Sequence, residues 1–307
     1  MARQPDTQLR PATNRPNPAV NLTGTDNADV MLGDANSNTY SSGAGDDLMF
    51  ASAGSDSLSG GAGADIVDYS RVNADLTFYR GGVMTKSGGL GTDTISNFDI
   101  EVIKANPNRI NTIDGSTGTT ASLNVNLANN LLTINNLPRI GSASLTVEHF
   151  QNVRGSENAD IITGSNAEND LSGGAGDDLI SGLSGSDKLT GGTGNDTFRF
   201  GRGDSLLNGF DRITDLQIGF DQIDGLVASN SVRNFGSVGS LSAGDLGQVL
   251  NNRSFGSNLA ASFSLGSGDS TRTFLALNDN RAGFQADNDI LIEITGYSGN
   301  LSALQII

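Results

Sequence analysis

Residues 24–68, written in rows of nine, read GTDNADVML, GDANSNTYS, SGAGDDLMF, ASAGSDSLS and GGAGADIVD. Residues 155–199 repeat the arrangement as GSENADIIT, GSNAENDLS, GGAGDDLIS, GLSGSDKLT and GGTGNDTFR. The sixth position of a row is always Asp or Asn: Asp29, Asn38, Asp47, Asp56, Asp65, Asp160, Asn169, Asp178, Asp187 and Asp196. The eighth position is always apolar. Ten matching rows without an insertion inside either block indicate a structural repeat rather than a flexible linker.

Each row predicts a turn followed by a short strand. Glycine supplies the positive φ angles of the turn and lets the backbone approach an ion closely. The turn glycines are Gly43, Gly45, Gly54, Gly61, Gly63, Gly174, Gly176, Gly185, Gly192 and Gly194. Two rows then form an 18-residue coil, and successive coils stack as parallel strands about 4.8 Å apart.

Stacked coils place carboxylates that are 18 residues apart one above another. Two carboxylates at this spacing repel each other by about 1 kcal/mol even in water. A hard divalent cation between the turns reverses the sign of this energy. Carboxylate and carbonyl oxygens form a flexible cage that suits Ca²⁺ better than Mg²⁺, whereas transition metals prefer His and Cys ligands.

The rows GGAGADIVD, GGAGDDLIS and GGTGNDTFR resemble the GGxGxDxUx nonapeptide of RTX (repeats-in-toxin, hemolysin-type) proteins. The resemblance implies that each ion lies between one turn and the turn 18 residues later. The implied pairs are 29/47, 38/56, 47/65, 160/178, 169/187 and 178/196, or about six Ca²⁺ ions. Asn38 and Asn169 carry no charge, so we expect weaker sites there.

Residues 69–154 are interpreted as short alternating β segments outside the nine-residue pattern. We expect them to continue the solenoid as longer, ion-free spacer coils. A small separate β domain is the alternative. The predicted division is a disordered N-terminal tail (1–21), a first β-roll block (22–68), the spacer coils (69–154), a second block (155–200) and a capping and secretion domain (201–307).

Residues 201–226 contain a D-x-I-x-D-x-x-x-G-x-D-x-I-D pattern, formed by Asp211, Ile213, Asp215, Gly219, Asp221, Ile223 and Asp224. This pattern resembles the segment that closes the roll in serralysin-type proteases. The resemblance implies that Asp204 and Asp211 complete a terminal ion site beside Asp196; a solvated acidic turn is the alternative. Residues 227–307 resemble the C-terminal domain of type I-exported RTX proteins, in which an uncleaved export signal lies near the C-terminus. We therefore expect secretion without a cleaved N-terminal signal peptide, because residues 1–21 contain no apolar stretch.

Composition excludes several classes of function. The net charge is −16, with 29 Asp but only 5 Glu among the acids, which argues against nucleic acid and anionic membranes as partners. Cysteine is absent, so disulfides and thiol chemistry are excluded. The single histidine, His149, is interpreted as a surface or structural residue. No apolar run is long enough to span a membrane.

The sequence thus predicts an all-β protein: a right-handed parallel β-roll or β-solenoid with Ca²⁺-binding turns and a C-terminal β-rich capping domain. We expect a secreted, non-enzymatic protein, extracellular or cell-surface associated, that folds on Ca²⁺ after type I export and has a structural or adhesive role. The partners are calcium ions, the type I secretion apparatus and, as a candidate, cell-surface polysaccharide. The alternative function is an extracellular polysaccharide-acting enzyme with a site on the face of residues 69–154.

Overall fold

The computed structural model describes residues 6–7, 20–118, 120–226, 228–229 and 231–307. The chain divides into two compact units, residues 1–152 and 153–307, and each is considered by itself. Most of the tail expected over residues 1–21 lies outside the described residues. The division into five segments stays a prediction.

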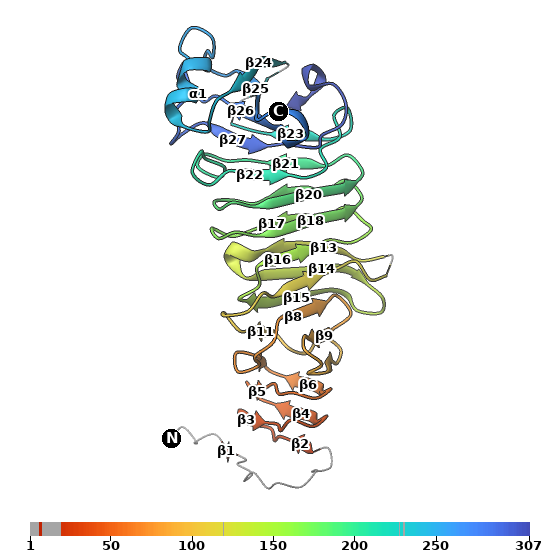
Figure 1. Ribbon diagram of the computed structural model, residues 1–307. Helices are drawn as coiled ribbons and strands as arrows, with labels where there is room; N and C mark the ends of the chain where they lie inside the picture. The colour runs from red at the N-terminus through yellow and green to blue at the C-terminus, as the bar shows by residue number, and fades with distance from the viewer. Residues whose placement is uncertain (1–5, 8–19, 119, 227, 230) are drawn as a thin grey trace. The chain divides into compact units, whose positions relative to one another are not determined.

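The first unit consists of two sheets of short strands (Figure 1). One sheet has the order β1-β3-β5-β7-β11-β15-β14-β13, and the other has the order β2-β4-β6-β10-β9-β8-β12. The bounds of these elements are β1 Asp6–Thr7, β2 Asn21–Thr23, β3 Asp29–Leu32, β4 Thr39–Ala44, β5 Leu48–Phe50, β6 Ser57–Ala62, β7 Ile66–Asp68, β8 Leu76–Tyr79, β9 Val83–Lys86, β10 Thr92–Ile95, β11 Val102–Lys104, β12 Thr112–Asp114, β13 Ser122–Asn126, the 3-10 helix η1 Leu127–Asn129, β14 Leu131–Leu137 and β15 Gly141–Glu148.

The nine-residue pattern sets the register of the coils. Strand β3 pairs in parallel with β5, and β4 with β6, so that Met31 lies beside Met49 and Tyr40 beside Leu58. Every apolar residue of the eighth position is buried in both blocks, as the sequence predicts. Each such side chain contributes about 1.5–3 kcal/mol when it is removed from water. These side chains form the core between the two sheets.

Residues 69–152 continue the sheets of the first unit but add antiparallel hairpins. Strands β10 and β11 pair in parallel with β6 and β7, the last strands of the first block. Between β7 and β10 the chain inserts the hairpin β8–β9, and β9 also pairs antiparallel with β10. After β12 it inserts the antiparallel run β13–β14–β15. The prediction of spacer coils did not include these hairpins.

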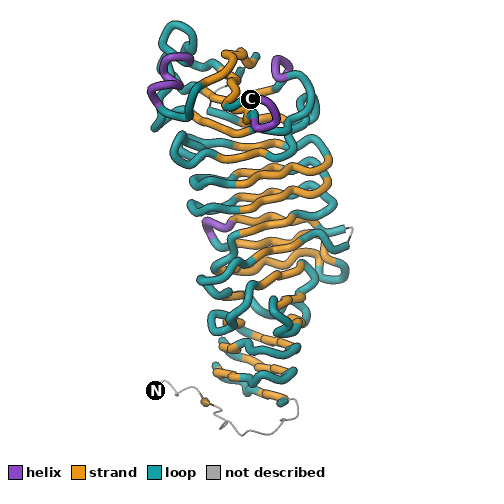
Figure 2. The backbone as a smooth tube through the Cα atoms, viewed as in Figure 1, coloured by secondary structure: helices purple, strands orange, loops and turns teal. Residues whose placement is uncertain are grey.

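The second unit also has two sheets (Figure 2). Their orders are β17-β19-β21-β23-β28 and β18-β20-β22-β27-β26-β25-β24. The bounds are β17 Ile161–Thr163, β18 Asp170–Ala175, β19 Leu179–Ser181, β20 Lys188–Thr193, β21 Thr197–Arg199, β22 Asp211–Ile213, β23 Gln222–Asp224, β24 Val232–Val238, α1 Ala243–Val249, β25 Ala260–Leu265, η2 Gly268–Ser270, β26 Arg272–Leu277, β27 Ile290–Glu293, η3 Leu301–Ala303 and β28 Gln305–Ile306. In sequence, β16 (Asn152–Arg154) lies at the boundary of the two units.

The C-terminal residues cover the open edges of the last coil. Strand β27 pairs in parallel with β22, and β28 pairs in parallel with β23. Outside β27 the sheet continues through β26 and β25 in antiparallel pairs and ends with β24, which pairs in parallel with β25. These strands pack around an aromatic core, in which the rings of Phe263 and Phe274 stack with centroids 5.4 Å apart. Helix α1 joins this core through Leu246, and the Ser242 side chain caps its N-terminus by accepting the Asp245 N–H. Exposed strand edges promote aggregation, and the pairing of β27 and β28 with the last coil removes such edges from β22 and β23.

No helix in the described part of the chain is long and apolar enough to cross a membrane.

Candidate metal centre

The repeat carboxylates form hydrogen-bonded ladders along the turns. In each ladder the backbone N–H of one repeat residue donates to Oδ1 of the repeat residue 18 positions later. The six bonds are Asp29–Asp47 (2.8 Å), Asn38–Asp56 (2.8 Å), Asp47–Asp65 (2.9 Å), Asp160–Asp178 (2.8 Å), Asn169–Asp187 (2.8 Å) and Asp178–Asp196 (3.0 Å). The structure thus brings together all six pairs that the spacing predicts.

The second oxygen of these carboxylates has no protein partner in the later coils, except in Asp56, whose Oδ2 accepts the Ser52 hydroxyl (3.2 Å). The buried Oδ2 atoms without a hydrogen bond, among the described repeat residues, belong to Asp47, Asp65, Asp178, Asp187 and Asp196. Burial of a polar oxygen without a partner is costly, and native proteins avoid it. Burial also raises the pKa of Asp178 to about 8 and that of Asp187 to about 7. It raises the pKa of Asp65 and of Asp196 to about 6.

A hard cation fits these oxygens. The described residues contain no group of three or more His, Cys, Asp or Glu side chains that could hold a metal ion. A cation in the ladders would therefore take its other ligands from backbone carbonyls of the turns. Carboxylate and carbonyl oxygens together are the donor set that Ca²⁺ prefers. The bound ion would place a positive charge beside the five Oδ2 atoms that have no hydrogen-bond partner.

Glycine allows the turns to stack closely. All ten turn glycines named above adopt positive φ angles. At Gly61 (φ 95°) a Cβ atom would overlap the carbonyl oxygen of Gly43 in the preceding coil. At Gly192 (φ 105°) it would overlap the carbonyl oxygen of Gly174. Any other residue at these positions would push the coils apart.

The turns fall into two classes, which the sequence pattern did not distinguish. In the first turns of each block, the N–H of the second residue donates to the side-chain oxygen of the sixth. These bonds are Thr25–Asp29 (2.6 Å), Asp34–Asn38 (3.0 Å), Ser156–Asp160 (2.5 Å) and Ser165–Asn169 (2.7 Å). In the later turns the second residue has positive φ instead, as in Gly43, Gly174 and Leu183 (φ 66°), except in the turn of Ser52, whose hydroxyl donates to Oδ2 of Asp56 (3.2 Å). The sixth-position carboxylate of each of these positive-φ turns keeps the unpartnered oxygen.

Both ladders of each unit continue beyond the two blocks of nine-residue rows. The N–H groups of the last repeat residues donate as Asp56–Asp93 (2.9 Å), Asp65–Glu101 (2.7 Å), Asp187–Asp211 (2.9 Å) and Asp196–Asp221 (3.1 Å). Asp93 and Glu101 were missed because inserted loops change the spacing, and Asp221 was named only as part of the closing motif and not as a site residue. A signal was present, since each acid is followed two positions later by a buried Ile: Ile95, Ile103 and Ile223.

Asp93 also belongs to a nonapeptide that the sequence analysis overlooked. Residues 88–96 read GGLGTDTIS, which fits the pattern completely. The interpretation of residues 69–154 as lying outside the pattern was therefore wrong at this position. The row was missed because residues 69–87 separate Gly88 from the end of the first block at Asp68, and these 19 residues place it out of phase with rows of nine.

The expected placement of Asp204 and Asp211 beside Asp196 is corrected by the hydrogen bonds. Asp211 lies next to Asp187, and burial raises its pKa to about 9. Asp204 accepts the N–H of Gly201 through Oδ2 (2.6 Å). Asp221 takes the place beside Asp196. The closing segment thus ends both ladders rather than one.

His149 lies in a turn of the first unit. Its backbone is left-handed (φ 66°), its side chain is exposed, and its carbonyl oxygen accepts a hydrogen bond from the Asn111 amide (2.8 Å). The neighbouring Glu148 carboxylate lies 3.7 Å from the Lys104 ammonium. The backbone of His149 therefore has a structural role.

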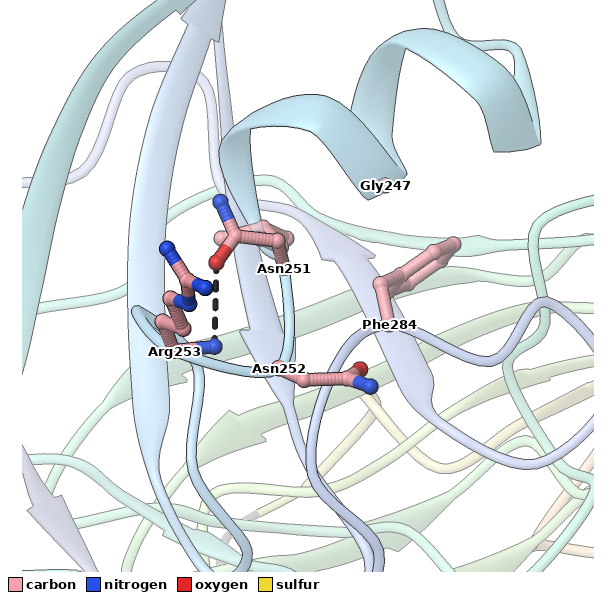
Figure 3. A pocket seen from close by; sticks show the side chains of 6 residues that line it. Gly247, Asn251, Asn252, Arg253 and Phe284 are labelled. Carbon is pink, nitrogen blue, oxygen red and sulfur yellow. Dashed lines mark hydrogen bonds between the residues drawn. The ribbon is translucent and has the colours of Figure 1, made fainter.

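An open pocket lies in the second unit, beside the C-terminal end of α1 (Figure 3). Its lining includes Asn251, Asn252, Arg253 and Phe284, and the backbone N–H of Arg253 donates to Oδ1 of Asn251 (3.0 Å). The six described lining residues include no carboxylate, hydroxyl or imidazole. We assign no chemistry to this pocket.

Stacked coils with ladders of buried carboxylates define a calcium-binding β-roll. The family model described as Peptidase M10 serralysin C terminal matches residues 138–300, more than half of the chain. The model of the RTX calcium-binding nonapeptide repeat matches residues 21–49 and 41–73. The chain belongs to the serralysin C-terminal family and is a secreted, calcium-binding RTX protein of the type I export class.

No curated protein matches the chain. Among solved structures, it is similar to the AlgE6R3 subunit of the mannuronan C5-epimerase from Azotobacter vinelandii, at 26% identity over 50% of this chain and 85% of that chain (TM-score 0.30). It is also similar to the extracellular lipase LipA from Serratia marcescens, at 16% identity over 94% of this chain and 40% of that chain (TM-score 0.25).

Proposed function

We propose that this protein is a non-enzymatic, structural or cell-surface adhesive component that folds on extracellular Ca²⁺ after type I export. The observation that carries the proposal is the row of buried, unpartnered Oδ2 atoms in the later coils. A chain that buries these oxygens without a cation loses their hydration and gains nothing in return. The fold is therefore expected to depend on the ion.

The same carboxylates keep the chain open inside the cell. Ladder carboxylates at the spacing of stacked coils repel each other, and each further coil adds another such repulsion. Extracellular calcium modules bind with dissociation constants on the order of 10⁻⁴–10⁻³ M, so these sites fill only outside. Because metal binding to a site that exists only in the folded state is itself folding energy, filling the sites closes the roll.

A calcium titration followed by circular dichroism tests this proposal. In EDTA we expect the β signal to be largely absent, and we expect it to appear cooperatively near millimolar Ca²⁺. The same concentration of Mg²⁺ is expected to be ineffective, because Mg²⁺ requires rigid octahedral geometry. A full β signal in EDTA would refute the proposal. Equilibrium dialysis on the same samples gives the number of ions, which we expect to be about six.

The non-enzymatic role has its own test. We expect no turnover of polysaccharides or peptides with Ca²⁺ present. Turnover that is lost in the variants Glu148→Gln or His149→Ala would instead support the alternative of an extracellular polysaccharide-acting enzyme. Binding of the folded protein to cell-surface polysaccharide without turnover would agree with an adhesive role.

A further inference from the structure

One lysine is buried inside the first unit, at the end of a carboxylate ladder. The chain contains three lysines, and the side chains of Lys104 and Lys188 are partly exposed. The side chain of Lys86 is completely buried. Its ammonium donates to Oδ1 of Asp93 (2.5 Å) and to the carbonyl oxygen of Ser52 (2.8 Å). It also lies 3.6 Å from Oδ2 of Asp56, whose side chain is equally buried.

These three oxygens belong to two successive turns of one ladder. Asp56 is the sixth residue of the row ASAGSDSLS, and Asp93 is the sixth residue of GGLGTDTIS. The N–H of Asp56 donates to Oδ1 of Asp93, as between any two stacked repeat residues. The ammonium therefore contacts the pair of carboxylates that a calcium ion would join, together with a carbonyl oxygen of the turn.

The turn of residues 88–96 stacks on the turn of residues 51–59 regularly in its second half but not in its first half. In regular coils the second residue of a turn lies directly over the carbonyl of the second residue one coil earlier, as Gly61 does over Gly43. Gly89 is the second residue of its row, and a Cβ there would meet nothing within 4 Å. The fourth residue, Gly91, still stacks on Gly54. The first half of the turn is thus displaced, and the Ser52 carbonyl bonds the ammonium instead.

The β8–β9 hairpin positions the Lys86 ammonium beside Asp93. Strand β9 ends at Lys86 and pairs with β10, which carries Asp93. A lysine ammonium is a compact point charge with three donors, so it can serve several oxygens at once. An ammonium left buried without anionic partners would be strongly destabilising, whereas two carboxylates and a carbonyl satisfy it.

We propose that Lys86 is a tethered cation that takes the place of a metal ion between Asp56 and Asp93. The row at residues 88–96 therefore matches the calcium-binding pattern in sequence but binds no calcium. At the end of the ladder 38–56–93, the Lys86 ammonium neutralises the carboxylates in place of a metal ion. The inference rests on the proposed role of Ca²⁺ in the other coils.

The test compares Lys86→Gln with Lys86→Arg and with the surface control Lys104→Gln. Lys86→Gln removes the charge and leaves two buried carboxylates, so we expect it to bind one more Ca²⁺ per chain than the wild type. Lys86→Arg keeps the charge, and Lys104→Gln changes a partly exposed side chain, so both are expected to keep the wild-type number. Equilibrium dialysis with metal analysis gives the count.

Thermal melting over a calcium series is the second readout. We expect Lys86→Gln to be less stable than the wild type at low Ca²⁺ and to recover toward the wild-type midpoint at saturating Ca²⁺. An unchanged ion count, or a loss of folding that Ca²⁺ does not rescue, would overturn the inference. A wild-type protein that binds no Ca²⁺ at all would instead overturn the proposed function.

Discussion

At the scale of single residues, the two oxygens of a repeat carboxylate have different roles. In Asp178, Oδ1 accepts the N–H of Asp160 and holds two coils in register, whereas Oδ2 is buried without a partner. The hydrogen bond requires only an acceptor. The unpartnered oxygen requires a positive charge. A substitution that preserves the first and removes the second therefore separates stacking from ion binding.

Asp178→Asn is such a substitution. Its amide oxygen can still accept the Asp160 N–H, but its amide nitrogen cannot ligate a cation. We expect the calcium midpoint of folding to rise by roughly tenfold, or about 1.4 kcal/mol, because the site loses a charged ligand. The measurement is the circular dichroism titration. The exposed residue Asp26 gives the matched control Asp26→Asn, and equal midpoints for both variants would contradict the assigned role of Oδ2.

At the scale of turns and strands, the sequence predicted the coils that follow the nine-residue period without interruption. It missed the repeat residues that lie after an inserted hairpin or loop. Glycine and Asp at fixed positions determine both blocks, and all ten predicted inward-facing side chains are buried. The row at residues 88–96 was missed because the β8–β9 hairpin separates it from the block it continues. The capping of Asp29 by the Thr25 N–H could not be read from the repeat, because it depends on the backbone angle at one turn residue.

Close stacking of turns gives a prediction at this scale. Gly61→Ala places a Cβ at a positive φ and against the Gly43 carbonyl, whereas Gly141→Ala has the positive φ but open space around it. We expect Gly141→Ala to cost about 1–2 kcal/mol of unfolding free energy. Gly61→Ala should cost more, at least about 3 kcal/mol, because the backbone must shift. Denaturant unfolding in saturating Ca²⁺ measures both, and similar losses would show that coil contact is not limiting.

At the scale of the whole chain, the net charge of −16 is a property of the ion-free state. Much of it comes from carboxylates whose positions the ladders fix, and about six Ca²⁺ ions would neutralise twelve of these charges. Protons compete for the same oxygens. Burial raises the pKa of Asp65 and Asp196 to about 6, of Asp187 to about 7, of Asp178 to about 8 and of Asp211 to about 9.

These pKa values predict opposite effects of pH on the two states of the protein. The unfolded carboxyl pKa is about 3.9, so between pH 4 and the raised values the folded, ion-free chain holds more protons than the unfolded chain. Its stability therefore falls as pH rises through this window. With Ca²⁺ bound the carboxylates must be ionised, so acid displaces the ion and stability rises with pH instead.

From pH 4.5 to 8, the circular dichroism β signal in EDTA and the melting temperature in saturating Ca²⁺ measure the two slopes. In EDTA we expect β structure to be gained toward the acid end, and in Ca²⁺ we expect the melting temperature to fall there. Protonation at low pH also lowers the net negative charge, and this alone would stabilise the folded chain in EDTA. The variants Asp178→Asn and Asp26→Asn are therefore compared. Each removes one charge, but Asp26 is exposed, whereas burial raises the pKa of Asp178 to about 8, so we expect Asp178→Asn to flatten the EDTA slope more than Asp26→Asn does. Equal slopes in the two variants would assign the pH dependence to bulk charge rather than to the ladders.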